Sequence, residues 1–213
     1  MKSKTTKKTI PKEYLDIEKW QTDRRSFLRG ALVAGAMTQI GFFTSCSVKL
    51  KEGNDLLTPE QATILDDIIN IFFPDDGNGP SAEDINAFGY VMWVLHDTLN
   101  RKIEDNAYII VGLNWADETA QEIYFAPFVE LSQEQKENLV GEFTKMKWGS
   151  NWSSMMITLI LEALVLDPIY GGNTNEVGWT WLNHTPGYPR PSETNRYERI
   201  MERQMKLKKD GEV

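Results

Sequence analysis

The sequence contains few of the residues that bind metal ions or act as nucleophiles. Its 213 residues include one cysteine and two histidines, His96 and His184. A single cysteine allows no disulfide within the chain, and this small supply of sulfur and imidazole ligands nearly excludes a His/Cys metal cluster. His96 lies beside the apolar stripe of a predicted helix, where a lone histidine is more often a boundary residue than a ligand.

Common cofactor and nucleophile motifs are also missing. No glycine fingerprint lies between a strand and a helix, so the sequence does not predict a dinucleotide-binding fold. It contains no Gly-x-Ser-x-Gly nucleophile elbow. Adjacent acids such as Asp75 and Asp76 are typical of a solvated surface, and nothing favours a paired-carboxylate glycosidase.

Alternating strand patterns of useful length are absent, whereas helical patterns fill the chain after residue 57. We therefore predict an all-α protein, a compact bundle of about five or six helices with a long C-terminal loop rich in glycine, proline and aromatic residues. Thr58 to Gln61 and Ser132 to Gln135 have the form of capping boxes. The predicted helices span 59–73, 81–99, 105–124, 133–147, 152–166 and 193–209.

The helical periods also predict which side chains are buried. The expected core residues are Ile64, Leu65, Ile68, Ile69, Phe72, Ile85, Phe88, Met92, Leu95, Leu99, Tyr108, Ile109, Gly112, Trp115, Ala116, Ile123, Leu139, Val140, Phe143 and Met146. Residues 148–151 are predicted to form a turn. The segment 152–166 is apolar on nearly every side, which predicts a central helix too short to span a bilayer. Its one charge, Glu162, requires a partner or an edge position, and a structural hydrogen bond is favoured over catalysis.

The net charge of −8 argues against nucleic acid as a ligand. The charge is uneven, because basic residues outnumber acidic ones before Cys46 and acidic residues dominate after it. Residues 1–45 resemble a twin-arginine signal peptide with Arg24, Arg25, Phe27 and Leu28 in the expected order. A mild apolar stretch and a lipobox-like segment ending at Cys46 follow, so we predict lipidation at Cys46 and a tether over 46–57.

The aromatic loop, defined here as residues 167–191, is the most unusual part of the sequence. It combines clustered glycines and prolines with Tyr170, Trp179, Trp181 and Tyr188, so it cannot be regular helix throughout. Large aromatic side chains either pack onto the domain or remain exposed until a binding partner covers them. Two interpretations remain open: a rigid surface feature that contacts a partner, or a closing loop that caps the domain's own core.

Several motifs of this loop resemble the gluconate 2-dehydrogenase subunit 3 family, the small subunits of membrane-associated flavoprotein sugar dehydrogenases. The resemblance covers about residues 57–191. The motifs that carry it are Asp167-Pro168-Ile169-Tyr170-Gly171-Gly172-Asn173, Gly178-Trp179, Gly187-Tyr188-Pro189 and, more weakly, Ile71-Phe72-Phe73-Pro74 with Ser81-Ala82.

This resemblance implies an all-helical subunit with no cofactor of its own. FAD would lie on a large subunit of the glucose–methanol–choline (GMC) oxidoreductase type, and a cytochrome c subunit with haem c often completes the complex. Substrate identity would reside in the large subunit.

We therefore predict a non-catalytic small subunit of a periplasmic FAD-dependent dehydrogenase acting on gluconate or another sugar. It would export, stabilise and anchor the flavoprotein through a helical domain over 58–191, followed by a charged helix or tail over 192–213. The candidate docking residues are Asp167, Pro168, Tyr170, Gly171, Gly172, Asn173, Trp179, Trp181, His184 and Tyr188. The sequence assigns no catalytic or metal-binding residue.

An alternative prediction is a stand-alone periplasmic lipoprotein that binds carbohydrate. Its loop rings would stack on a sugar, and Asn173, Asn175 and His184 would supply hydrogen bonds. A weaker third possibility is a hydrolase built on Glu162 or on the acidic loop.

Overall fold

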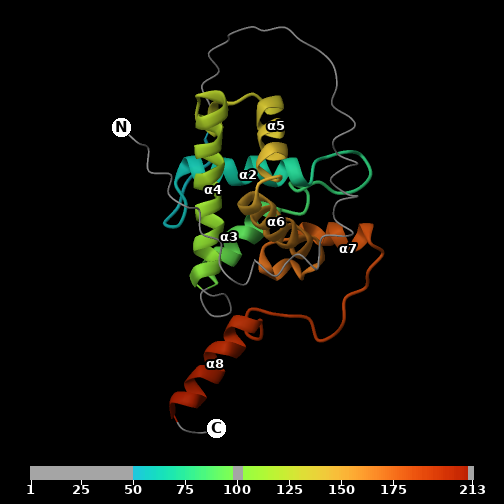
Figure 1. Ribbon diagram of the computed structural model, residues 1–213. Helices are drawn as coiled ribbons and strands as arrows, with labels where there is room; N and C mark the ends of the chain where they lie inside the picture. The colour runs from blue at the N-terminus through green and yellow to red at the C-terminus, as the bar shows by residue number, and fades with distance from the viewer. Residues whose placement is uncertain (1–49, 98–102, 211–213) are drawn as a thin grey trace. The chain divides into compact units, whose positions relative to one another are not determined.

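The computed structural model describes residues 50–97 and 103–210 (Figure 1). The chain divides into two units, residues 1–49 and 50–213, and all the helices named here belong to the second. The predicted export and lipidation residues Arg24, Arg25, Phe27, Leu28 and Cys46 lie outside the described residues, as does Leu99.

The described part of the chain is all-helical, with seven α-helices and no strand. The helices are α2 (Pro59–Phe72), α3 (Ala87–His96), α4 (Ile103–Tyr124), α5 (Gln133–Phe143), α6 (Lys147–Val165), α7 (Val177–Trp181) and α8 (Tyr197–Asp210). In the bundle, α2 packs against α4 and α5, and α6 packs against α3 and α4 (Figure 1). The predicted fold class is confirmed; the additional helix is α7, whose five residues lie inside the aromatic loop, where periodicity gives no signal.

Both predicted capping boxes are present. The Thr58 hydroxyl accepts from the Gln61 amide at 3.2 Å, and the Gln61 side chain accepts from the Thr58 amide at 2.9 Å. Ser132 and Gln135 make the same reciprocal pair at the start of α5. The predicted core face of α2, from Ile64 to Phe72, is buried. These boundaries follow from local chemistry, because a cap satisfies amides that the first helical turn leaves without partners.

The predicted start of α3, at residue 81, was wrong. Residues 82–86 form turns, and α3 begins at Ala87 after Asn86, which adopts a left-handed φ of 51° and caps the Gly89 amide. Ile85 lies in these turns and not in the helix, so it does not set the phase of the helix's buried face. The core residues are Tyr90, Val91, Val94 and Leu95, whereas the predicted Phe88 and Met92 are only partly buried.

A second correction concerns the connection from α5 to α6. The expected turn at 148–151 is helical, and the break falls instead at residues 144–146. Gly149 explains how so short a break is possible, since a Cβ on it would lie 1.9 Å from the Phe143 carbonyl oxygen. Because the break comes early, Met146 is 39% exposed rather than buried.

The central-helix prediction for 152–166 holds for one side of α6. Trp152, Met156 and Leu159 are buried, and the Trp152 indole donates to the Ile109 carbonyl of α4 at 3.1 Å. Leu161 and Val165 are about half exposed. Ile123, predicted as core, is also exposed, because it lies near the end of α4.

Candidate functional site

The aromatic loop begins with a short turn that lies against α3. Asp167 accepts a hydrogen bond from the Ile169 amide at 3.1 Å, and Pro168 opens the turn. Gly171 follows with φ 89°, and its carbonyl accepts from the Asn86 side chain at 2.7 Å. Glycine tolerates this left-handed conformation at little cost. These contacts place the loop beside the first turn of α3.

Asn173 fixes the next part of the loop from inside the protein. Its side chain is fully buried, donates to the Leu166 carbonyl at 3.0 Å and accepts from the Gly178 amide at 2.8 Å. A Cβ on Gly172 would lie 2.7 Å from the Ala163 carbonyl, and one on Gly178 would lie 2.2 Å from the Leu164 carbonyl. Gly172 therefore lets the loop, and Gly178 lets α7, pack directly on the backbone of α6.

Trp179 completes this contact between α7 and α6. It is 5% exposed, and its indole donates to the Val165 carbonyl at 2.7 Å. The Arg190 guanidinium lies 4.9 Å from the ring centroid and pairs with Asp167 at 2.9 Å and with Glu176 at 2.6 Å. Hydrogen bonds to Asp167 and then to Glu176 raise the pKa of Arg190. One arginine thus joins the start and the end of the loop.

Part of the loop faces solvent. Trp181 is 50% exposed, Tyr188 is 87% exposed, and His184 is exposed. The Trp181 indole is nevertheless held in place, because it donates to the Asn78 carbonyl at 3.1 Å and lies over Gly79, where a Cβ would meet the ring at 2.7 Å. The His184 amide donates to the Trp179 carbonyl at 2.8 Å. These contacts present rings on an ordered surface.

The predicted docking residues therefore separate into two groups. Those that contact the protein's own core or hold the loop's shape are Asp167, Pro168, Tyr170, Gly171, Gly172, Asn173 and Trp179. Those that face outward are Trp181, His184 and Tyr188. The first group closes the domain's own core, and the second leaves an exposed surface. Asn173 is excluded as a sugar contact, because its buried amide is already bonded to the backbone on both sides.

Two remaining titratable candidates have structural partners. Glu162 on α6 accepts from the Tyr90 hydroxyl of α3 at 2.9 Å, which is the structural hydrogen bond expected for it. His96 is exposed, and its ring nitrogen lies 2.7 Å from the Met92 carbonyl. No group of three or more His, Cys, Asp or Glu side chains in the described ranges could hold a metal ion. No helix of these ranges is both long and apolar enough to cross a membrane.

Sequence reasoning missed several residues that build this region. Asn86, Glu176 and Arg190 hold the loop, and Leu161 and Val165 add exposed apolar surface on α6. The sequence does hint at the ion pairs of Arg190, because Arg190 is the one Lys or Arg in residues 167–191 and the loop also contains Asp167 and Glu176. The exposure of Leu161 and Val165 could not be predicted in this way, because an apolar residue in a helix does not indicate which side of the helix lacks a neighbour.

The fold and the loop define a helical domain closed by a glycine- and aromatic-rich motif that packs on α6. Residues 59–187 match the family described as gluconate 2-dehydrogenase subunit 3, and the chain belongs to this family. The match begins at α2 and ends within the aromatic loop. Comparisons with curated proteins and with solved structures give no match.

Proposed function

We propose that this chain is the non-catalytic small subunit of a periplasmic FAD-dependent dehydrogenase of the GMC type, acting on gluconate or another sugar. The observation that carries the proposal is the family match over 59–187, which includes nearly all of the bundle and most of the loop. The family name designates one subunit of a larger enzyme, which implies a catalytic partner subunit. In this proposal FAD belongs to that partner, and haem c belongs to a third, cytochrome c subunit.

The outward-facing part of the aromatic loop is the proposed docking surface for the flavoprotein. Trp181, Leu182 and Tyr188 are between 45% and 87% exposed. On α6, against which α7 packs, Leu161 and Val165 expose further apolar area. Trp and Tyr dominate the energetics of protein interfaces, and large exposed apolar patches are unusual on an isolated protein. The buried residues of the motif then act indirectly, by holding these rings in position.

Export and anchoring complete the proposed role. The Arg24–Arg25 pair would direct folded export, and acylation at Cys46 would attach the complex to the membrane. A flavoprotein without a signal of its own could then cross as a folded complex with this chain. Part of the predicted tether over 46–57 lies on the bundle, because Lys51 pairs with Asp66 at 2.7 Å and Leu57 is 1% exposed.

Co-purification from the native membrane tests the docking surface. We expect a tagged wild-type chain to bring down a protein with flavin absorbance. Replacing both Trp181 and Tyr188 by alanine should weaken the complex by ~30-fold or more, because truncating one hot-spot residue typically costs about 2 kcal/mol or more. The thermal unfolding midpoint should fall only modestly, because Tyr188 is 87% exposed, although Trp181 loses its hydrogen bond to the Asn78 carbonyl.

Phe125→Ala provides a matched control, because this ring is 91% exposed and lies at the end of α4, outside the aromatic loop. It should retain the flavoprotein. A tagged wild-type chain that is repeatedly recovered alone would count against the proposed function. Equal recovery with the double variant and with wild type would reject this surface while leaving the subunit role intact.

A further inference from the structure

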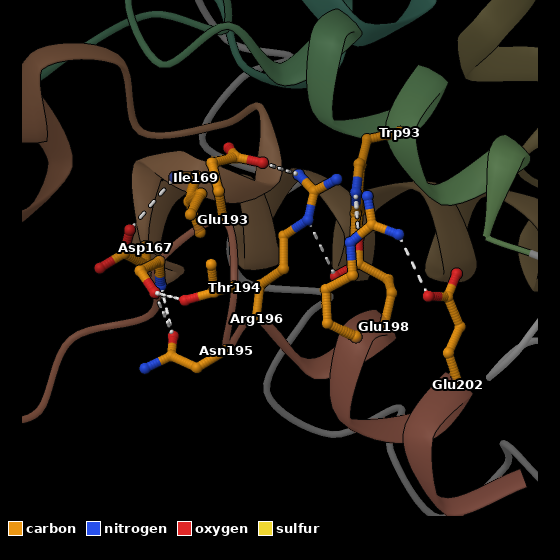
Figure 2. Close-up of polar contacts among 11 residues, drawn as sticks. Trp93, Asp167, Ile169, Glu193, Thr194, Asn195, Arg196, Glu198 and Glu202 are labelled. Atoms are coloured by element: carbon orange, nitrogen blue, oxygen red, sulfur yellow. Dashed lines mark hydrogen bonds and ion pairs between the residues drawn. The ribbon is translucent and has the colours of Figure 1, made fainter. Parts of the chain in front are cut away.

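The C-terminal helix α8 is held to the bundle through its first turn. The Tyr197 hydroxyl donates to Asp97, which ends α3, and the Trp93 indole of α3 donates to Glu198 at 3.1 Å. The Tyr197 ring lies edge-on to the Trp93 ring, with 5.6 Å between the ring centroids. Figure 2 shows Glu198 beside Trp93 and Arg196. Side chains of α3 therefore fix where α8 begins.

The rest of α8 takes no part in the main packing between helices, which involves α2 to α7. Ile200 and Met205 are each 42% exposed, and Met201 and Leu207 are partly buried. The other side chains over 199–209 are exposed. Beyond its first turn, α8 therefore presents apolar side chains that the bundle does not cover.

These apolar side chains lie on one side of the helix. They continue the side that begins with Tyr197, at helical spacing: Ile200, Met201, Met205 and Leu207. Gln204 and Lys208 also fall on this side, and the stem of a lysine can lie along an apolar surface while its charge extends outward. The opposite side carries charged residues, among them Arg199, Glu202, Arg203, Lys206 and Lys209.

The charge of α8 differs from that of the chain before it. The helix contains five Lys or Arg and three Asp or Glu, whereas residues 51–196 contain 8 Lys or Arg and 23 Asp or Glu. Glu202 of α8 is also paired with Arg199 at 3.1 Å. A charged surface acts mainly on charges within about 8 Å at physiological salt. In this acidic protein, α8 is therefore the helix that an anionic surface would attract.

The length and composition of α8 favour a lipid surface over a protein partner. Its 14 residues span about 21 Å, less than the ~30 Å thickness of bilayer hydrocarbon. A helix with one apolar side, Lys and Arg on the other and low overall hydrophobicity typically lies in the plane of the headgroups. Protein interfaces, in contrast, are depleted in lysine, and α8 contains three.

We propose that α8 lies on an anionic lipid surface. Ile200, Met201 and Met205 enter the headgroup region, and the Lys and Arg side chains extend to lipid phosphates. This contact gives the bundle a defined orientation on the membrane. The proposal does not rest on the proposed function, because it needs neither a flavoprotein nor an acyl chain at Cys46.

The described chain after the predicted lipid site contacts the same helix as α8. The Lys51 ammonium lies 4.0 Å from the Phe88 ring centroid of α3, and Asp55 lies 3.6 Å from His96 at the end of α3. An acyl chain at Cys46 and the apolar side of α8 are therefore compatible with one bilayer.

Vesicle flotation tests the proposal with a chain that begins at Leu50. Residues 50–213 form a unit of their own, and the buried core of the described residues lies over 57–179. Omitting residues 1–49 also removes a basic segment that would bind anionic lipid by itself. We expect phosphatidylcholine vesicles with about 30% phosphatidylglycerol to bind this chain at least ~10-fold more tightly than phosphatidylcholine alone.

One double variant tests the apolar side of α8. Ile200→Asp combined with Met205→Asp should abolish vesicle binding without loss of the bundle, because both side chains are 42% exposed. The matched control is Ile123→Asp combined with Phe125→Asp, which adds the same charges at two exposed positions near the end of α4. It should bind vesicles as the wild type does.

A second double variant tests the charge and preserves good helix formers. Lys206→Glu combined with Lys209→Glu should weaken binding at least ~10-fold. Lys145→Glu combined with Lys147→Glu, at exposed positions between α5 and α6, should leave binding unchanged.

Failure of the wild-type chain to bind the phosphatidylglycerol vesicles would overturn the proposal, as would equal binding by either α8 variant. Sedimentation velocity without vesicles tests the competing occupant. Self-association that is lost in the Ile200 and Met205 double variant, with no binding to vesicles, would assign this side of α8 to a second copy of the chain instead.

Discussion

Two asparagines of the aromatic loop share a backbone conformation but not an environment. Asn173 and Asn175 both have left-handed φ angles, 47° and 55°. Asn173 is fully buried and bonded to the Leu166 carbonyl and the Gly178 amide, whereas Asn175 is exposed. Comparing the same substitution at the two positions therefore separates the free-energy cost of an unusual backbone angle from the cost of losing buried hydrogen bonds.

We expect Asn173→Ala to lower the free energy of unfolding by about 2–4 kcal/mol, because it leaves a partly buried carbonyl and a buried amide without their partner. Asn175→Ala should cost only about 1 kcal/mol, the penalty for a left-handed alanine. Urea denaturation of both variants measures the difference. Similar losses in the two would mean that the side-chain bonds of Asn173 contribute little.

The importance of Asn173 could be inferred from the sequence, but its role could not. The sequence marks the motif from Asp167 to Asn173 as specific and predicts partner docking for all of its residues except Ile169. The structure instead buries Asn173 and Gly172 against α6. A sequence motif does not distinguish residues that contact a partner from residues that support those contacts, since both depend on particular side chains.

At the scale of the elements, the contact between α4 and α6 depends on one glycine. A Cβ on Gly112 would lie 1.9 Å from the Trp152 indole nitrogen, which donates to the Ile109 carbonyl. Gly141 of α5 differs, because a Cβ there would meet nothing within 4 Å. The same substitution at these two helical positions should therefore act in opposite directions.

We expect Gly112→Ala to destabilise the protein by about 3 kcal/mol or more, because the indole must move and its buried hydrogen bond is lost. Gly141→Ala should stabilise it by about 0.5–1 kcal/mol, since alanine reduces the conformational freedom of the unfolded chain and its methyl group meets no neighbour in the folded helix. Thermal unfolding followed by circular dichroism compares them. If both variants stabilise the protein, the packing described for Gly112 is wrong.

Most of the helices could be predicted from the sequence, and the errors in their predicted boundaries have physical causes. Capping boxes set the starts of α2 and α5 through hydrogen bonds between near neighbours, which a sequence displays. The start of α3 depends on Asn86, whose side chain also donates to Gly171, 85 positions further along the chain. A contact at that separation has no local signature, so the predicted start at residue 81 was wrong.

At the scale of the whole molecule, the proposed export and anchoring roles can be separated by two substitutions. Replacing Arg24 and Arg25 by lysine should leave both this chain and its flavoprotein in the cytoplasm, because the paired arginines are read by the folded-export route. Cys46→Ser should permit export but release the complex from the membrane, since no acyl chain can be added. Fractionation with immunoblotting and a flavin assay measures both.

These two variants serve as controls for each other, because each should affect only one step. A flavoprotein that still reaches the periplasm with the double lysine variant would contradict the escort role. Membrane retention of Cys46→Ser would show that another contact, such as a cytochrome subunit, provides the anchor.

The sequence by itself determined the all-helical fold, most of the core faces and the family motif, because these depend on periodicity, capping and local backbone constraints. Only the tertiary structure decided which half of the aromatic loop is buried, that Leu161 and Val165 are exposed, and that Tyr197 and Glu198 meet the rings of α3. The reason is that burial depends on neighbours distant in the chain. Tyr197 lies 100 residues from Asp97, and no local pattern records that contact.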